Sequence, residues 1–197
     1  MRGREWPDAL DLRGVTESVV TTLGPNDRWN LAALGLQVPE DGDEPVAART
    51  WGRTRTWRNF TEQGEGYVQF TRDPLTFVDA ALAVHEADDP VLDDADAWVR
   101  VEVERLAAGE SDGTPWVDWA LSPVESRVLR EAVPTTNRGY NAVVEATVAA
   151  SRLDVDAYDS AVLLDRLRYF ESVVETAGGH REREAFERVR ECVDADW

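Results

Sequence analysis

The sequence has no lysine, and its 197 residues include one cysteine, one methionine and two histidines. A single cysteine, Cys192, excludes an internal disulfide and a metal site built from several cysteines. His85 and His180 lie far apart in the chain and show no short His-x-His spacing, so no metal site of the usual imidazole kind is predicted. The sequence also has no G-x-S-x-G motif and no P-loop, so no hydrolase nucleophile of that type and no Walker-type nucleotide site is predicted.

Long hydrophobic runs are absent too. No stretch approaches the roughly 20 apolar residues that a membrane-spanning helix needs. The first residues, MRGREWPDALDL, lack the apolar core of a signal peptide. We therefore expect a cytoplasmic protein with no membrane partner.

Charge of one sign dominates. There are 39 acidic against 21 basic residues, all arginine, and the net charge is -18. This balance argues against nucleic acid as a partner, because binding to its backbone needs a basic surface. A hydrophobic content of 43% still indicates a folded chain. The surface resembles that of haloarchaeal proteins, in which molar salt shortens the screening length to about 3 Å and weakens the self-repulsion.

Patterning divides the chain into a β-rich part and a helical part. Short β-branched or alternating segments with turn residues between them predict strands in residues 14–38, which form a hairpin, and in 46–53, 66–71, 97–107 and 114–121. The acidic stretch 85–96 is predicted as a loop, and from about residue 138 the apolar spacing becomes helical. We expect a mainly β, α+β protein: an antiparallel barrel of six or seven strands over residues 1–133, and a helical segment over 134–197.

Two short helices interrupt the strands. Thr54 or Thr56 can cap the first, which Gly64 can end, and Asp73 followed by Pro74 begins the second. A helix start attracts phosphate, since its first N–H groups have no partner within the helix. In the first helix, Thr56 and Asn59 add polar groups, and three arginines add charge: Arg53, Arg55 and Arg58. On spacing alone this stretch is either a phosphate cradle or a capped surface helix whose arginines balance nearby acids.

The order of short motifs resembles one family. It is the archaeal and bacterial family of FMN-binding split-barrel proteins called domain of unknown function 447. The resemblance covers nearly the whole chain and is carried by ESVVTT, NLAALGL, TRTWRNF, YVQFTRDPLTFVDAAL and NRGYNAVVEATVAASRL, in that order. It implies a split barrel with a C-terminal helical part, an FMN cofactor and a homodimer.

The resemblance also implies the site. FMN phosphate would lie against the helix start of Thr54, Thr56 and Asn59, with Arg53 as its charge partner. Thr71 is a further cofactor-binding residue in this pattern. The ring would lie along the strands near a subunit interface, with Asn30 and Ala33 beside it and Arg138 completing the pocket from a partner subunit. Gln69 and Trp57 depart from the family pattern, which has Asn and Tyr there. The alternatives are structural roles: a strand end for Thr71, a core aromatic for Trp57 and helix capping by the Asn137–Gly139 turn.

Three functions remain open from the sequence. The first is a flavin-dependent oxidoreductase or flavin reductase, with a nicotinamide or another small redox substrate. The second is a non-enzymatic flavin carrier or redox sensor. The third keeps the barrel and replaces FMN with a deazaflavin. The cofactor itself would carry the redox chemistry, so no residue is predicted to be catalytic.

Overall fold

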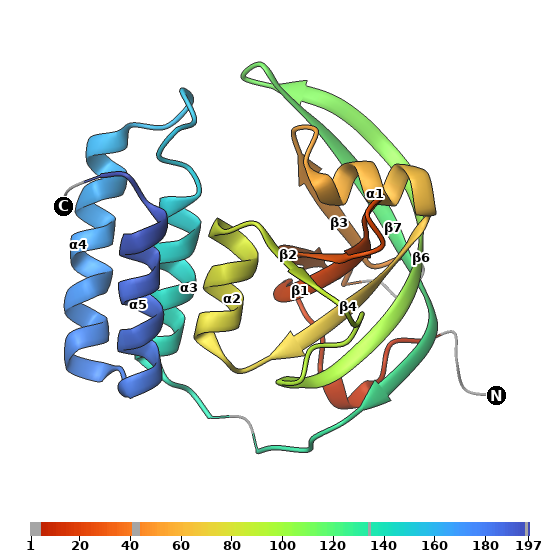
Figure 1. Ribbon diagram of the computed structural model, residues 1–197, viewed down its shortest axis with the longest axis horizontal. Helices are drawn as coiled ribbons and strands as arrows, with labels where there is room; N and C mark the ends of the chain where they lie inside the picture. Colours follow the sequence, from red (N-terminus) through yellow and green to blue (C-terminus); the bar gives the residue numbers. More distant parts are fainter. Residues whose placement is uncertain (1–4, 41–43, 134, 196) are drawn as a thin grey trace. The chain divides into compact units, whose positions relative to one another are not determined.

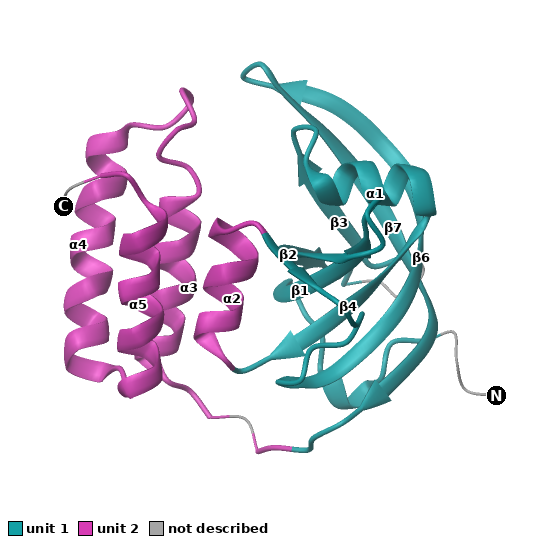
Figure 2. Ribbon diagram, viewed as in Figure 1, with its two compact units in different colours: residues 1–72, 85–131 teal, residues 73–84, 132–197 magenta. Residues whose placement is uncertain are grey.

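The computed structural model describes residues 5–40, 44–133, 135–195 and 197, and these form two compact units. Unit 1 comprises residues 1–72 and 85–131, and unit 2 comprises residues 73–84 and 132–197 (Figure 2). Residues 73–84 therefore group with the helices, although the sequence prediction placed them in a first domain of residues 1–133. The predicted boundary includes residue 134, which lies outside the described residues, so that boundary stays a prediction.

Unit 1 is built on one antiparallel sheet (Figure 1). Its strands are β1 (Val15–Leu23), β2 (Trp29–Gln37), β3 (Ala47–Trp51), β4 (Glu65–Thr71), β5 (His85–Ala87), β6 (Ala95–Ser111) and β7 (Thr114–Val128). Their order is β1-β4-β6-β7-β3-β2-β5, and β1 also pairs with β2. That additional pairing closes six strands into a barrel and leaves β5 attached outside the ring, to β2. The predicted split-barrel fold is confirmed.

Alternation along the strands fills the barrel. In β6, Val99 and Val101 are fully buried while Trp98 and Arg100 are half-buried, as expected where successive side chains point to opposite faces. The barrel core joins residues of six strands and of α1 (Arg55–Gln63): Val20, Leu34, Leu36, Ala48, Phe60, Val68, Val99, Val101, Val117, Trp119 and Leu121. The helix thus contributes Phe60 to a core that otherwise consists of strand residues.

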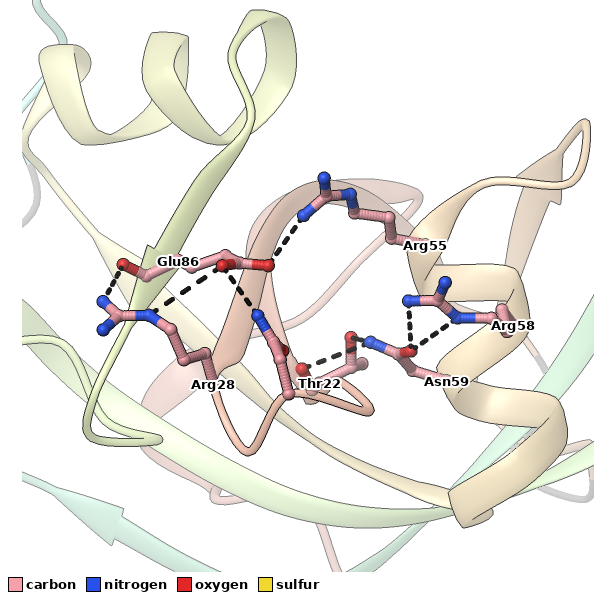
Figure 3. Close-up of polar contacts among 7 residues, drawn as sticks. Thr22, Arg28, Arg55, Arg58, Asn59 and Glu86 are labelled. Carbon is pink, nitrogen blue, oxygen red and sulfur yellow. Dashed lines mark hydrogen bonds and ion pairs between the residues drawn. The ribbon is translucent and has the colours of Figure 1, made fainter.

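One predicted loop is partly a strand. The sequence prediction made residues 85–96 an acidic loop, but His85–Ala87 form β5, which pairs antiparallel with Trp29–Leu31 of β2. A strand of three residues is too short to show an alternating pattern, so only its pairing partner reveals it. This correction matters because β5 brings Glu86 to the start of α1 (Figure 3).

Helix starts follow the predicted caps. The Asp73 carboxylate accepts a hydrogen bond from the Leu75 backbone N–H at 2.9 Å, and Pro74 is the first residue of α2 (Pro74–Leu82). Asn137 caps α3 (Arg138–Ala150) by accepting hydrogen bonds from the backbone N–H groups of Gly139 and Tyr140. Short polar side chains favour these positions because they satisfy N–H groups that the helix leaves free.

Unit 2 packs α2 and α3 with α4 (Ser160–Ala177) and α5 (His180–Cys192). Val78, Val143, Leu167 and Val189 are fully buried in its core. Asp73 and Asp79 of α2 pair with Arg181 and Arg188 of α5, respectively. Hydrogen bonds from Arg181 to Asp73 and to Glu184 of its own helix raise the pKa of the Arg181 guanidinium.

A close backbone approach explains Gly139. A Cβ atom added there would lie 2.4 Å from the Gly178 Cα atom, at the end of α4. We expect Gly139→Ala to lower the free energy of unfolding of unit 2 by about 1–3 kcal/mol, since the backbone must move apart. Chemical denaturation followed by circular dichroism measures the loss. Glu145→Ala, on an exposed position of the same helix, serves as the control, and an equal loss in both variants would contradict the steric explanation.

Candidate functional site

The start of α1 follows β3 after a short turn. The Thr54 hydroxyl caps the helix by accepting a hydrogen bond from the Trp57 backbone N–H at 3.2 Å. Gly64 ends it in the left-handed conformation, with φ 70°. Both ends agree with the prediction from sequence. The other backbone N–H groups of the first turn have no partner within the helix, so they can donate hydrogen bonds to a group that lies at this helix start.

A polar row crosses three strands near this helix. Asn30 of β2 lies directly opposite Thr22 of β1 on one side and Glu86 of β5 on the other. Directly opposite residues in antiparallel strands point to the same face of the sheet, so the three side chains form one row. The sequence separates them by up to 64 positions, and the barrel brings them together.

Asn59 connects α1 to this row. Its side-chain amide donates hydrogen bonds to the Thr22 hydroxyl at 2.9 Å and to the Thr22 carbonyl oxygen at 3.4 Å (Figure 3). Its carbonyl oxygen accepts from the Arg58 guanidinium at 3.3 and 3.4 Å. With 1% of its surface exposed, Asn59 is anchored inside unit 1 and also orients Arg58.

The three arginines at this helix differ in their partners. Arg55 forms an ion pair of 2.7 Å with Glu86. Arg53 lies over the Trp57 ring, with 5.9 Å from its guanidinium carbon to the ring centroid, and has no carboxylate partner within the described residues. Arg58 likewise lacks one there, and its guanidinium donates hydrogen bonds to the neutral Asn59 side chain. In a chain with so many acids, two arginines without a counter-charge at one helix start leave a local excess of positive charge.

Thr56 is the second distinctive group. It is 4% exposed, and its hydroxyl has no hydrogen-bond partner among the described residues. The hydroxyl oxygen is not among the fully buried unpaired atoms, so it is open to solvent and can donate a hydrogen bond to a ligand. Together with the helix N–H groups and the arginines, this arrangement suits a small anion with several acceptor oxygens, such as a phosphate group.

Three predicted residues lie elsewhere in unit 1. Ala33 of β2 and Gln69 of β4 both lie opposite Val19, so they share a face, and by alternation it is the face opposite to that of Asn30. Gln69 is fully buried and uses its carboxamide within the protein, donating to Pro90 and Thr21 and accepting from the Leu92 N–H. Thr71 ends β4 and donates a hydrogen bond to Asp94 at 2.7 Å.

Arg138 belongs to unit 2. It is the first residue of α3, directly after the capping Asn137, and its side chain is exposed. The capping role considered for this turn is therefore observed. A ligand contact by Arg138 stays a prediction.

Sequence reasoning missed Thr22, Arg28 and Glu86. Glu86 lay in the predicted loop, and Arg28 lies in a turn that gives no motif, yet Arg28 contacts the Glu86 carbonyl oxygen at 3.1 Å. Nothing in the spacing of these residues from α1 could have identified them. Only the antiparallel register of β1, β2 and β5 places them here.

Other chemistries have little support. Within the described residues no group of three or more His, Cys, Asp or Glu side chains could hold a metal ion. Burial raises the pKa of the half-buried Cys192 thiol, which lowers its nucleophilic thiolate fraction. No helix in the described part of the chain is long and apolar enough to span a membrane.

Comparison with known proteins gives matches over most of the chain. Residues 16–130 match a family model described as "Protein of unknown function (DUF447) N-terminal domain", and residues 137–191 match "Protein of unknown function (DUF447)". The crystal structure of an FMN-bound protein of this family from Methanosarcina mazei is similar with a TM-score of 0.77 and 25% identity, over 92% of this chain and 96% of that chain.

Two further solved structures are similar over a smaller part of the chain. Nitrilotriacetate monooxygenase component B from Bacillus cereus matches with a TM-score of 0.44 and 17% identity, over 66% of this chain and 79% of that chain. Flavoredoxin from Methanosarcina acetivorans matches with a TM-score of 0.42 and 10% identity, over 61% of this chain and 72% of that chain.

Proposed function

Because the chain belongs to the DUF447 family, in which the similar protein from Methanosarcina mazei is FMN-bound, we propose that it binds FMN. The phosphate would lie at the start of α1. The observation that carries this proposal is the Thr56 hydroxyl, which has no hydrogen-bond partner among the described residues, in a helix start that also holds two arginines with no carboxylate partner there. A capped, charge-balanced surface helix would show neither feature.

Each predicted contact has a defined part in this proposal. Thr56 donates its hydroxyl to a phosphate oxygen, and Arg53 supplies charge. Thr54 and Asn59 hold the helix start in place through their own hydrogen bonds. Asn30, in the row beside Asn59, is the predicted residue best placed to meet the ribityl chain. Trp57 supports Arg53 through its ring face.

The residues outside this region are weaker candidates. Ala33, Gln69 and Thr71 lie beyond the polar row, and direct contact with the ring remains a proposal for them and for Arg138. The observed contacts of Gln69 and Thr71 favour structural roles, because their polar groups already have partners within unit 1.

Bound FMN would supply hydride chemistry at its ring, and the protein would supply binding and orientation. We therefore propose a flavin-dependent oxidoreductase or flavin reductase, with a nicotinamide as one class of electron donor. A cytoplasmic location in a high-salt cell and a homodimeric state belong to the same proposal. The charge of -18 supports the high-salt setting.

The test is an absorbance spectrum of the purified protein, with mass spectrometry of whatever boiling releases. A flavin absorbs at about 450 nm and a deazaflavin at about 420 nm. We expect stoichiometric FMN, and NADH or NADPH oxidation that depends on it. Bound FMN without turnover would favour a carrier or sensor, and a colourless protein that takes up no FMN would contradict the proposal.

Thr56→Ala provides the point test. The variant should bind FMN about 10- to 100-fold more weakly, because a hydrogen bond to a charged group contributes about 1.5–3 kcal/mol. The control is Thr61→Ala, the same change on the same helix, where the hydroxyl bonds the Trp57 carbonyl oxygen at an exposed position. Fluorescence titration with FMN measures both, and equal affinities would remove Thr56 from the site.

A further inference from the structure

Glu86 is the one carboxylate that contacts the arginines of α1 within the described residues. Its side chain pairs with the Arg55 guanidinium at 2.7 Å, and it also accepts a hydrogen bond from the Asn26 amide at 3.1 Å (Figure 3). The Arg28 guanidinium contacts the same residue from the other side. It donates a hydrogen bond to the Glu86 carbonyl oxygen at 3.1 Å and lies 3.8 Å from the Glu86 carboxylate. The carboxylate therefore has a defined position, facing the helix start.

The pair remains open to exchange. The Arg55 side chain is 45% exposed and that of Glu86 25% exposed. Ion pairs with this much solvent contact contribute little, about 0–1 kcal/mol, so a stronger anion can displace the carboxylate. A phosphate monoester carries up to two charges and three acceptor oxygens, and arginine binds such groups in bidentate geometry.

We infer that the Glu86 carboxylate competes with the FMN phosphate for Arg55, so that Arg55 is a phosphate contact and Glu86 sets the affinity and its dependence on salt. This inference rests on the proposed FMN site. In the flavin-free protein Glu86 neutralises Arg55. When FMN enters, Arg55 turns from the carboxylate to the phosphate, while Arg28 and Asn26 keep Glu86 in place.

The consequence for salt follows from screening. Salt weakens the attraction between arginines and phosphate, but it also weakens the Arg55–Glu86 pair that must break. The two effects oppose each other, so the affinity of the wild-type protein should change little with salt. Without the carboxylate only the first effect remains, and the affinity should fall steeply as salt is added. Such compensation would suit a protein whose charge indicates a high-salt setting.

The experiment measures the Kd for FMN by fluorescence titration in wild type, Glu86→Gln, Arg55→Ala and the double variant. Two salt concentrations are used: about 1 M, where the screening length is about 3 Å, and the lowest concentration at which thermal melts show all four proteins folded. Asp88→Asn is the matched control, since its exposed carboxylate pairs with Arg28 at 2.7 Å and with no arginine of α1.

We expect Glu86→Gln to bind FMN about fivefold more tightly than wild type at the lower salt, the size of one Coulomb interaction at contact distance in water. The gain should vanish near 1 M salt, and Asp88→Asn should show no gain. In the Arg55→Ala background the Glu86→Gln gain should drop below about twofold, because the two residues act together.

The possible failures are distinguishable. If Glu86→Gln binds FMN no more tightly than wild type at the lower salt, while Thr56→Ala is weakened, the competition is wrong and the FMN site stands. A gain that persists in full with Arg55→Ala would also overturn it, because Glu86 would then act by repulsion alone. If no protein binds FMN at either salt, the proposed function fails, and with it this inference.

Discussion

Replacing Gln69 with leucine is expected to lower the free energy of unfolding of unit 1 by about 1–3 kcal/mol. The carboxamide of Gln69 donates to the Thr21 hydroxyl at 3.0 Å and to the Pro90 carbonyl oxygen at 2.8 Å, and it accepts from the Leu92 N–H at 2.7 Å. Leucine fills a similar volume but replaces none of these bonds. The Thr21 hydroxyl and the Pro90 carbonyl oxygen keep the hydrogen bond that joins them at 2.5 Å, so the main loss is the partner of the Leu92 N–H, which costs about 1–3 kcal/mol.

The contacts of Gln69 also show which part of unit 1 the change would loosen. Pro90 and Leu92 belong to the segment between β5 and β6, so one side chain of β4 fastens that segment to the outside of the barrel. Urea unfolding measures the loss, and Gln63→Leu, the same change at the exposed end of α1, is the control and should stay within about 0.5 kcal/mol of wild type. A loss below about 1 kcal/mol for Gln69→Leu would mean that water replaces these bonds.

The same variant tests the predicted flavin contact of Gln69. If the carboxamide serves only the protein, folded Gln69→Leu should bind FMN with nearly the affinity of wild type. A loss of affinity in the folded variant, at a temperature well below its unfolding midpoint, would instead support a direct contact with the ring or the ribityl chain.

Phe60→Ala should be the most destabilising change in α1, at about 3–5 kcal/mol. The Phe60 ring is 2% exposed, packs in the barrel core and meets the Trp119 ring edge-on, with 5.5 Å between the centroids. Truncation removes this contact and leaves a cavity between the helix and the strands. Tryptophan fluorescence during denaturation reports the loss, since every tryptophan except Trp197 lies in unit 1.

A matched control separates the effect of removing a buried ring from the effect of removing any aromatic side chain. Tyr169→Ala removes an aromatic side chain that is 62% exposed on α4, and it should cost less than about 1 kcal/mol. Phe60→Ala should also weaken FMN binding, because the position of Thr56 and Arg58 depends on how α1 is anchored. If Phe60→Ala were no more destabilising than the control, the packing of α1 on the barrel would be wrong.

Local features of the structure could be predicted from the sequence. The starts of α1, α2 and α3 follow from Thr54, Asp73 and Asn137, because a capping side chain satisfies N–H groups within three residues of itself. Strand alternation in β6 and the two hairpins are similarly short-range patterns. The order of motifs also identified the family and, through it, the split barrel, which the closed six-stranded ring confirms.

The candidate site could be predicted only in part. Thr54, Thr56, Asn59 and their arginines were found because they lie within one helical turn or two of each other. Asn30 and Ala33 were both predicted beside the ring, but alternation and the observed register put Ala33, with Gln69, on the face of the sheet opposite to that of Asn30. A shift of one residue along a strand reverses its faces, and the sequence does not state the register.

By itself, then, the sequence determined the capped helix starts, the strand pattern, the family and the positive helix start that suits a phosphate. Only the tertiary structure decided that β5 exists, that α2 joins the C-terminal helices in unit 2, and that Thr22, Asn30 and Glu86 form one row facing α1. The physical reason is the range of the interactions. Caps and alternation act over a few residues and leave a local pattern, whereas strand register and ion pairs such as Arg55–Glu86 join groups that meet only after the barrel closes.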